Sequence, residues 1–101
     1  MSDYYKLEDG VVTPCDTLKE WCEWMSTADR QIERTAINDD VDVSTVFLGI
    51  DHRWTKDVGS PIIFETLVFG GEFDGNGGRY TSIDAAKQGH AIILAKVRQG
   101  K

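Results

Sequence analysis

Two apolar runs dominate the middle of the chain, and a polar loop separates them. The runs, at residues 41–50 and 62–69, are rich in Val, Ile, Phe and Thr, which suit a pleated and buried surface. Neither run alternates strictly between apolar and polar positions. In the second run Phe64 and Leu67 would point to opposite faces, yet both are apolar. Because a half-solvated strand alternates, the pattern predicts two adjacent central strands covered on both faces.

Weaker signals predict further extended segments around these runs. Glu8-Asp9-Gly10 lies between extended residues 4–7 and 11–15, and Asp-Gly in that setting predicts a β-hairpin. Residues 31–39 have the alternation of a more polar strand, which the turn residues 38–40 would join to the first apolar run. After the second run, Arg79-Tyr80 predicts a short extended segment.

Helical periodicity appears at two places. Residues at i, i+3, i+4 and i+7 form an apolar face in the segment after Pro14, which Asp16 or Thr17 would cap: Leu18, Trp21, Cys22 and Met25. Near the C-terminus, after a cap at Thr81 or Ser82, the face comprises Ala86, His90, Ile93, Leu94 and Val97. The sequence therefore predicts a single α+β domain, residues 1–101, with a mostly antiparallel sheet of about five strands and two helices packed on one face. The other face would be left for a partner subunit or a ligand pocket.

Composition limits the classes of partner. The chain of 101 residues has a formal charge of −6 and a pI near 4.7, which disfavour non-specific binding of nucleic acid and of anionic membranes. No apolar run approaches the roughly 18 residues of a membrane span, and the polar N-terminus lacks a signal-peptide core. We therefore expect a cytoplasmic location. Cys15 and Cys22 form no CxxC motif, and we expect both to be small buried hydrophobic residues.

Four residues with useful chemistry follow the first apolar run, where a buried strand opens into a loop: Asp51, His52, Arg53 and Trp54. A rigid strand that holds a variable loop is a frequent place for functional residues. Trp54 would stack on a planar ligand and Arg53 would pair with a phosphate. The alternative is a hairpin loop whose Trp folds back on the core and whose charges are solvated.

Glu65 lies in the middle of an apolar strand, where an unpaired carboxylate would be costly. Three placements remain open from sequence: a solvated pocket, an ion pair with Arg34 or Arg79, or a subunit boundary. His90 falls on the apolar face of the last helix beside Gly89. A hydrogen-bonded core histidine is the default interpretation there, and the helix cost of Gly89 indicates close packing.

The segment at residues 70–78 contains five glycines and is termed the glycine-rich loop below. It does not match a phosphate-binding GxxxxGK[ST] motif, but it would form a flap with Arg79 and Tyr80 facing an anionic, planar ligand. His52, His90, Asp51 and Glu65 have metal-ligand types without metal-ligand spacing, so no metal and no cofactor is predicted. No Ser or Cys stands in a nucleophile motif, which disfavours an enzyme.

Four blocks of the chain resemble a family of small phage and prophage proteins. VSTVFLGIDH at residues 43–52, FETLVFGG at 64–71, RYT at 79–81 and AKQGH at 86–90 are similar to the blocks VSTVFLGxDH, FETMVFGG, RYxT and AxxGH expected in that family. The resemblance covers nearly the whole chain. The chain departs from it at Leu67, where Met is expected, and in the glycine-rich loop, where acidic residues are expected.

By analogy with small phage proteins of similar size, the resemblance implies an anti-defence role in the host cytoplasm. Some of those proteins sequester nucleotide immune signals, for example ADP-ribose derivatives made by TIR enzymes or cyclic nucleotides. The leading hypothesis is a non-enzymatic homo-oligomer with a pocket between subunits or under the glycine-rich loop. Trp54 or Tyr80 would stack on the base, Arg53 or Arg79 would contact phosphate, and Asp51 or Glu65 would bind ribose hydroxyls.

Two other hypotheses come from different classes. The first is an acidic interaction module that docks on and inhibits a host defence protein. The second is a hydrolase of nucleotide signals that uses His52, His90 and Glu65.

Overall fold

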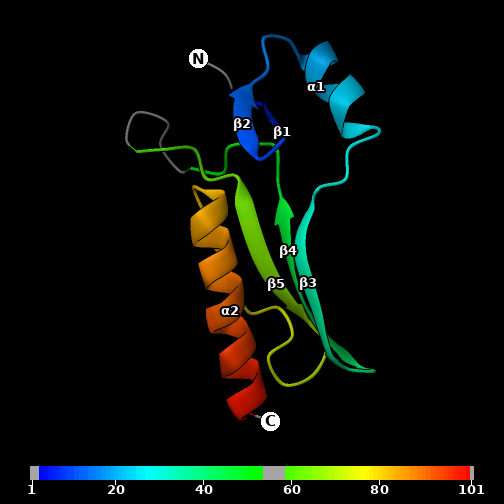
Figure 1. The fold of residues 1–101 in the computed structure, drawn as a ribbon, viewed down its shortest axis with the longest axis vertical. Coiled ribbons are helices and arrows are strands. Elements are labelled where there is room, and N and C mark those ends of the chain that lie inside the picture. The colour runs from blue at the N-terminus through cyan, green and yellow to red at the C-terminus, as the bar shows by residue number, and fades with distance from the viewer. Residues whose placement is uncertain (1–2, 54–58, 101) are drawn as a thin grey trace.

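The computed structural model describes residues 3–53 and 59–100, which form six strands and two helices (Figure 1). The predicted α+β class is confirmed, since the strands form a four-stranded and a two-stranded antiparallel sheet and a helix packs on the larger one. In chain order the elements are β1 (Tyr5–Glu8), β2 (Val11–Pro14), α1 (Leu18–Met25), β3 (Gln31–Asn38), β4 (Val41–Phe47), β5 (Phe64–Phe69), β6 (Gly77–Tyr80) and α2 (Ile83–Gly100).

The larger sheet has the strand order β3-β4-β5-β6, so each connection joins neighbours in space. In the register of β4 and β5, Val43 lies opposite Val68, and Phe47 lies opposite Phe64. All four side chains are buried on the same face of the sheet. Leu67, one position before Val68, points to the other face, because successive side chains of a strand alternate.

Helix α2 covers this inner face and packs against all four strands (Figure 1). Its predicted apolar face is confirmed: Ala86, His90 and Val97 are buried, and Ile93 and Leu94 pack on the core. The helix begins where predicted, with the Ala85 amide donating to the Ser82 hydroxyl. The inner face thus carries the hydrophobic core of the sheet.

The opposite side of the sheet is termed the open face below. Of the described elements, α2 alone packs along the sheet, and it lies on the inner side. Phe69 is 51% exposed on the open face. The sequence predicted central strands covered on two sides, and within one described chain only the inner side is covered. The open face carries the side chains of Arg34, Asp42, Ser44, Val46, Glu65, Leu67, Phe69 and Arg79.

The predicted N-terminal hairpin is present as β1 and β2, which form their own two-stranded sheet. Asp9 and Gly10 both have positive φ, at 52° and 79°, as a two-residue turn with the hairpin twist requires. The hairpin lies at the end of the larger sheet (Figure 1). There Tyr5 is buried in the cluster around Phe47 and Phe64.

The sequence predicted that both helices pack on the same face of the larger sheet, and this is wrong for α1. Helix α1 packs next to β1 at the end of that sheet (Figure 1). Two tryptophans hold it there. Trp21 Nε1 donates to the Gly49 carbonyl at 3.0 Å, and Trp24 packs edge-on against Phe47. Leu18 is 54% exposed. Because no residue of α1 is fully buried, the predicted apolar face is only partly covered.

The two cysteines differ in environment. Cys15 is buried as predicted, and its burial raises the pKa of the thiol. The same prediction is wrong for Cys22, which is exposed on α1, because that helix presents its tryptophans to the protein instead. No helix among the described residues is long and apolar enough to span a membrane.

Candidate functional site

Asp51 and Arg53 form a buried ion pair that holds the start of the loop after β4. Arg53 Nε and Nη2 lie 2.8 Å and 2.7 Å from Asp51 Oδ2. Asp51 Oδ1 accepts from the backbone amides of Arg53 and Ile62, so one carboxylate joins both ends of the loop. The side chains of Asp51 and Arg53 are only 0% and 9% exposed.

This pair also affects the acid–base properties of its neighbours. The hydrogen bond from Arg53 to Asp51 raises the pKa of the guanidinium. Burial, and next the charge of Asp51, raise the pKa of the Tyr5 hydroxyl. The guanidinium also donates to the Gly59 carbonyl. The guanidinium thus links Asp51 to Gly59, and the predicted phosphate contact of Arg53 stays a prediction.

The sequence also predicted His52 and Trp54, beside this pair, as ligand-binding residues. The side chain of His52 is exposed, while its backbone amide donates to the Ile62 carbonyl at 2.9 Å. Trp54, the predicted stacking residue, lies outside the described residues.

Glu65 has Arg79 as its partner on the open face, one of the placements that the sequence left open. The two residues lie opposite each other on β5 and β6, with Arg79 Nε donating to Glu65 Oε2 at 3.0 Å. The other candidate, Arg34, pairs with Asp42 at 2.6 Å. Both pairs are cross-strand contacts on the same solvated surface.

Tyr80 points to the inner side of the sheet, opposite to Arg79. Its ring lies against α2 at Gly89, where an added Cβ would be 2.2 Å from Tyr80 Cζ. This contact explains the glycine in the helix. Because Arg79 and Tyr80 lie on opposite sides of the sheet, they do not line a common pocket.

His90 lies in a buried chain of hydroxyl groups under α2. Nδ1 is 2.8 Å from Thr45 Oγ1, Nε2 is 3.0 Å from Thr35 Oγ1, and Thr45 Oγ1 is also 2.5 Å from Thr66 Oγ1. The imidazole is therefore hydrogen-bonded on both nitrogens. Glu65 lies on the open face, so it does not meet His90. The described residues also contain no group of three or more His, Cys, Asp or Glu side chains that could hold a metal ion.

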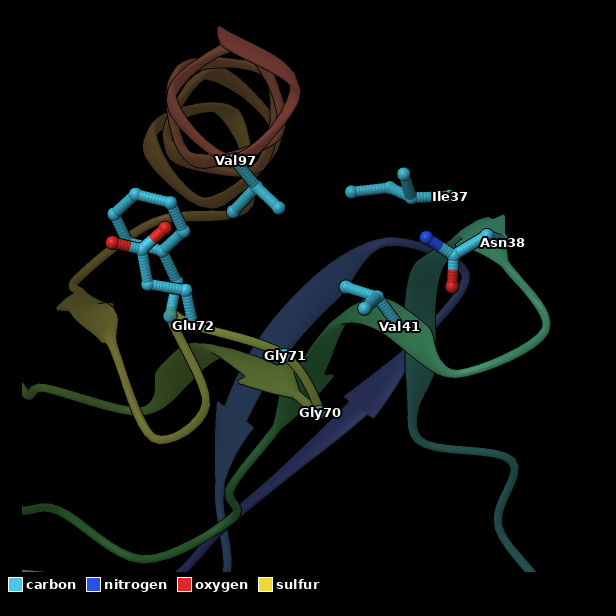
Figure 2. Close-up of a pocket in the computed structure, with 8 residues that line it drawn as sticks. Ile37, Asn38, Val41, Gly70, Gly71, Glu72 and Val97 are labelled. Atoms are coloured by element: carbon cyan, nitrogen blue, oxygen red, sulfur yellow. The ribbon is translucent and has the colours of Figure 1, made fainter. Parts of the chain in front are cut away.

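A cavity of about 250 Å³ lies beside the glycine-rich loop, at the end of the larger sheet away from the N-terminal hairpin (Figure 2). Three segments build it: the turn between β3 and β4, the start of the glycine-rich loop, and the C-terminal half of α2. Val97 is buried, and the side chains at the mouth are exposed. The lining residues are Ile37, Asn38, Val41, Gly70, Gly71, Glu72, Phe73 and Val97.

The backbone around this cavity is shaped by glycine. Gly70 has a φ of 90°, and an added Cβ there would lie 1.9 Å from the Asp40 carbonyl oxygen. Only glycine therefore lets the loop approach the β3–β4 turn so closely. Asp74 Oδ1 accepts from the Gly70 amide at 2.7 Å and holds the bend.

Six of the predicted ligand-binding residues are described by the structure, and none of these six lines the cavity: Asp51, His52, Arg53, Glu65, Arg79 and Tyr80. Its position agrees with one of the two places that the sequence suggested, under the glycine-rich loop. The sequence did hold one indication of a site there. Two consecutive glycines, which permit a tight bend, precede a polar and an aromatic side chain, Glu72 and Phe73. The contributions of Asn38 and Val97 depend on tertiary contacts.

Comparisons with protein-family models, curated protein sequences and solved structures found no match for this chain.

Proposed function

We propose that this chain is a phage-encoded anti-defence protein that binds a small nucleotide-derived immune signal and withholds it without chemical turnover. The observation that carries the proposal is the cavity beside the glycine-rich loop. Its interior is apolar and its mouth carries two polar side chains, Asn38 and Glu72. Few polar groups around an apolar interior are typical of small-molecule sites. The phage origin and the class of ligand come from the family resemblance.

The absence of turnover in this proposal rests on how the acid–base side chains are placed. His90 is buried between threonine hydroxyls, and Glu65 pairs with Arg79 on the open face. Neither side chain lines the cavity. Among the described residues, a ligand bound there would meet no pair of groups arranged for general acid–base catalysis.

We include a homo-oligomer in the proposal because the open face is separate from the cavity. Leu67 and Phe69 present apolar surface on the open face, whereas Val41 and Val97 line the cavity on the α2 side. A second copy on the open face would therefore leave the cavity accessible. Burial of apolar surface between copies is a common source of stability in small domains.

Native mass spectrometry with a mixture of ADP-ribose and cyclic nucleotides tests the proposal. We expect a discrete added ligand mass, and we expect the ligand recovered after denaturation to be chemically intact. A conservative exposed variant, Glu23→Gln on α1, should bind as wild type does. Absence of any added mass at ligand concentrations of several hundred micromolar would refute sequestration, and recovery of hydrolysed ligand would refute the non-enzymatic part.

A second function has its own supporting observation, the exposed Phe69 on the open face. In this alternative the open face docks on a host defence protein and inhibits it. Phe69→Glu should then abolish co-purification of a host protein, whereas Ile92→Glu should not. Ile92 is a matched control because it is an exposed hydrophobic residue, 68% exposed, on α2.

A further inference from the structure

The size of the cavity restricts which part of a nucleotide it can hold. Its volume of about 250 Å³ exceeds the roughly 150 Å³ of a protein cavity that binds benzene. It falls below the range of about 300–1,000 Å³ typical of pockets for drug-sized ligands. One planar ring system would fit, and a whole ADP-ribose molecule would not.

The charge of the lining indicates which end of the nucleotide enters. Among the described residues that line the cavity, Glu72 is the one charged side chain and none is basic. A phosphate inside would face a carboxylate without a compensating cation, which is unfavourable at short range. The part of the ligand held in the cavity is therefore uncharged or carries a hydrogen-bond donor toward Glu72.

The orientation of the Asn38 side chain determines a second hydrogen-bonding group that a ligand must carry. Its Oδ1 accepts from the Asp40 amide at 2.8 Å, which fixes the side-chain amide, since the oxygen must face that donor. The amide nitrogen then points into the cavity, with Glu72 on the other side (Figure 2). A complementary ligand has an acceptor at one end and a donor at the other.

Phe73 adds an aromatic wall to the cavity and links it to a positive charge. The ring packs on the end of α2, where an added Cβ at Gly100 would lie 2.4 Å from Phe73 Cζ. The Lys96 ammonium lies 5.6 Å from the ring centroid. Lys96 does not line the cavity, so its charge lies beside the site.

We infer that this cavity takes an amine-bearing purine base, with its amine toward Glu72 and a ring nitrogen toward Asn38, while the phosphate stays outside near Lys96. This inference rests on the proposed function and specifies the part of the signal that is recognised. Adenine has the required amine and ring-nitrogen acceptors at its two ends. Hypoxanthine, which has an oxo group in place of the amine, would set an acceptor against the carboxylate of Glu72.

Calorimetric titration of the full chain with adenosine, inosine, ribose phosphate and ADP-ribose tests the inference. We expect adenosine to bind within about tenfold of ADP-ribose, because most of the recognition lies in the base. Ribose phosphate alone should not bind detectably. Inosine should bind at least about tenfold more weakly than adenosine, the effect of losing one hydrogen bond to a charged group.

Two near-isosteric variants locate the site. Glu72→Gln should reduce or reverse the preference for adenosine over inosine, because the glutamine amide can donate to an oxo group. Asn38→Asp should weaken adenosine binding at least about tenfold, since it removes the donor but keeps the oxygen that accepts from Asp40. Glu23→Gln is the matched control, and circular dichroism checks that each variant is folded.

The outcomes separate this inference from the proposed function. Binding of ADP-ribose with no binding of adenosine, or with no effect of either cavity variant, would overturn the inference and leave sequestration standing at another site. Failure of all the nucleotides to bind to the wild type would overturn both.

Discussion

The ring of Tyr80 lies directly against Gly89, so that β6 and α2 approach with no side chain between them. An added Cβ at Gly89 would be 2.2 Å from Tyr80 Oη and 2.4 Å from Tyr80 Cε1. The sequence had placed Tyr80 at a ligand, and the structure places it in the packing between sheet and helix. The contact thus positions α2 over the sheet.

Gly89→Ala should destabilise the protein. Alanine favours a helix by about 1 kcal/mol over glycine, but overpacking of a core costs about 1–3 kcal/mol, and a contact of 2.2 Å requires the ring to move. We expect a net loss of up to about 2 kcal/mol, seen as a lower midpoint in urea unfolding. In a Tyr80→Ala background the same substitution should stabilise the protein. A stabilising effect in the wild-type background would show that the ring moves freely.

Thr45→Val should cost more stability than Thr66→Val, although both substitutions preserve shape. Thr45 Oγ1 is bonded both to His90 Nδ1 and to Thr66 Oγ1. Its removal takes a partner from two buried polar groups, at about 1–3 kcal/mol for each one left unsatisfied. Removal of the Thr66 hydroxyl leaves Thr45 bonded to His90, so the loss should be roughly half as large. Thermal unfolding of both variants tests this order, and equal losses would contradict it.

Local patterns in the sequence were enough to predict most of the fold. The Asp9-Gly10 turn, the pairing of β4 with β5 as adjacent central strands and the buried face of α2 depend on neighbouring residues, and all three are present. The prediction that β5 is covered on both faces is met on the inner face only, because burial alternates along the strand within the described chain. The position of α1 was not predictable in this way. The apolar periodicity of α1 predicts that one of its faces is buried, but not against which element. The hydrogen bond from Trp21 to the Gly49 carbonyl helps to determine where the helix packs.

The candidate site was less predictable because charged side chains choose their partners in three dimensions. The sequence made Arg53 a candidate for binding phosphate. In the structure its guanidinium forms an ion pair with Asp51, two residues away. The need of Glu65 for a partner was evident, yet the choice of Arg79 over Arg34 depends on strand register. The cavity brings together Asn38 and Val97, which are far apart in the chain and share no motif.

The attachment of α1 to the N-terminal hairpin should weaken in acid. Glu20 has a lowered pKa, first because Lys6 donates to its carboxylate and second because the Asp16 amide does. A lowered folded-state pKa gives stability that is present above the ordinary value of 4.5 and is lost as pH falls through the folded-state pKa. The NMR shift of the Asp16 amide should report this titration below pH 4.5. Glu20→Gln should remove it, and an unchanged titration in that variant would contradict the assignment.

Asp51→Asn should destabilise the protein far more than Asp42→Asn. Asp51 and Arg53 are 0% and 9% exposed, whereas Asp42 and its partner are 28% and 60% exposed. Breaking a pair that is largely shielded from water costs more than breaking an exposed one, because the remaining charge loses its partner without gaining full solvation. An exposed pair contributes about 0–1 kcal/mol. Urea unfolding of the two variants measures the difference.

The same variants distinguish a structural from a ligand-binding role for Arg53. If Arg53 fixes the loop, Asp51→Asn should lower the stability and leave the affinity for ADP-ribose in the folded fraction unchanged, because the pair does not line the cavity. If Arg53 instead contacts phosphate, freeing it from Asp51 should change the affinity at little cost in stability. Calorimetry well below the unfolding midpoint separates the two results. Unaltered stability with altered affinity would return the binding site to the loop after β4.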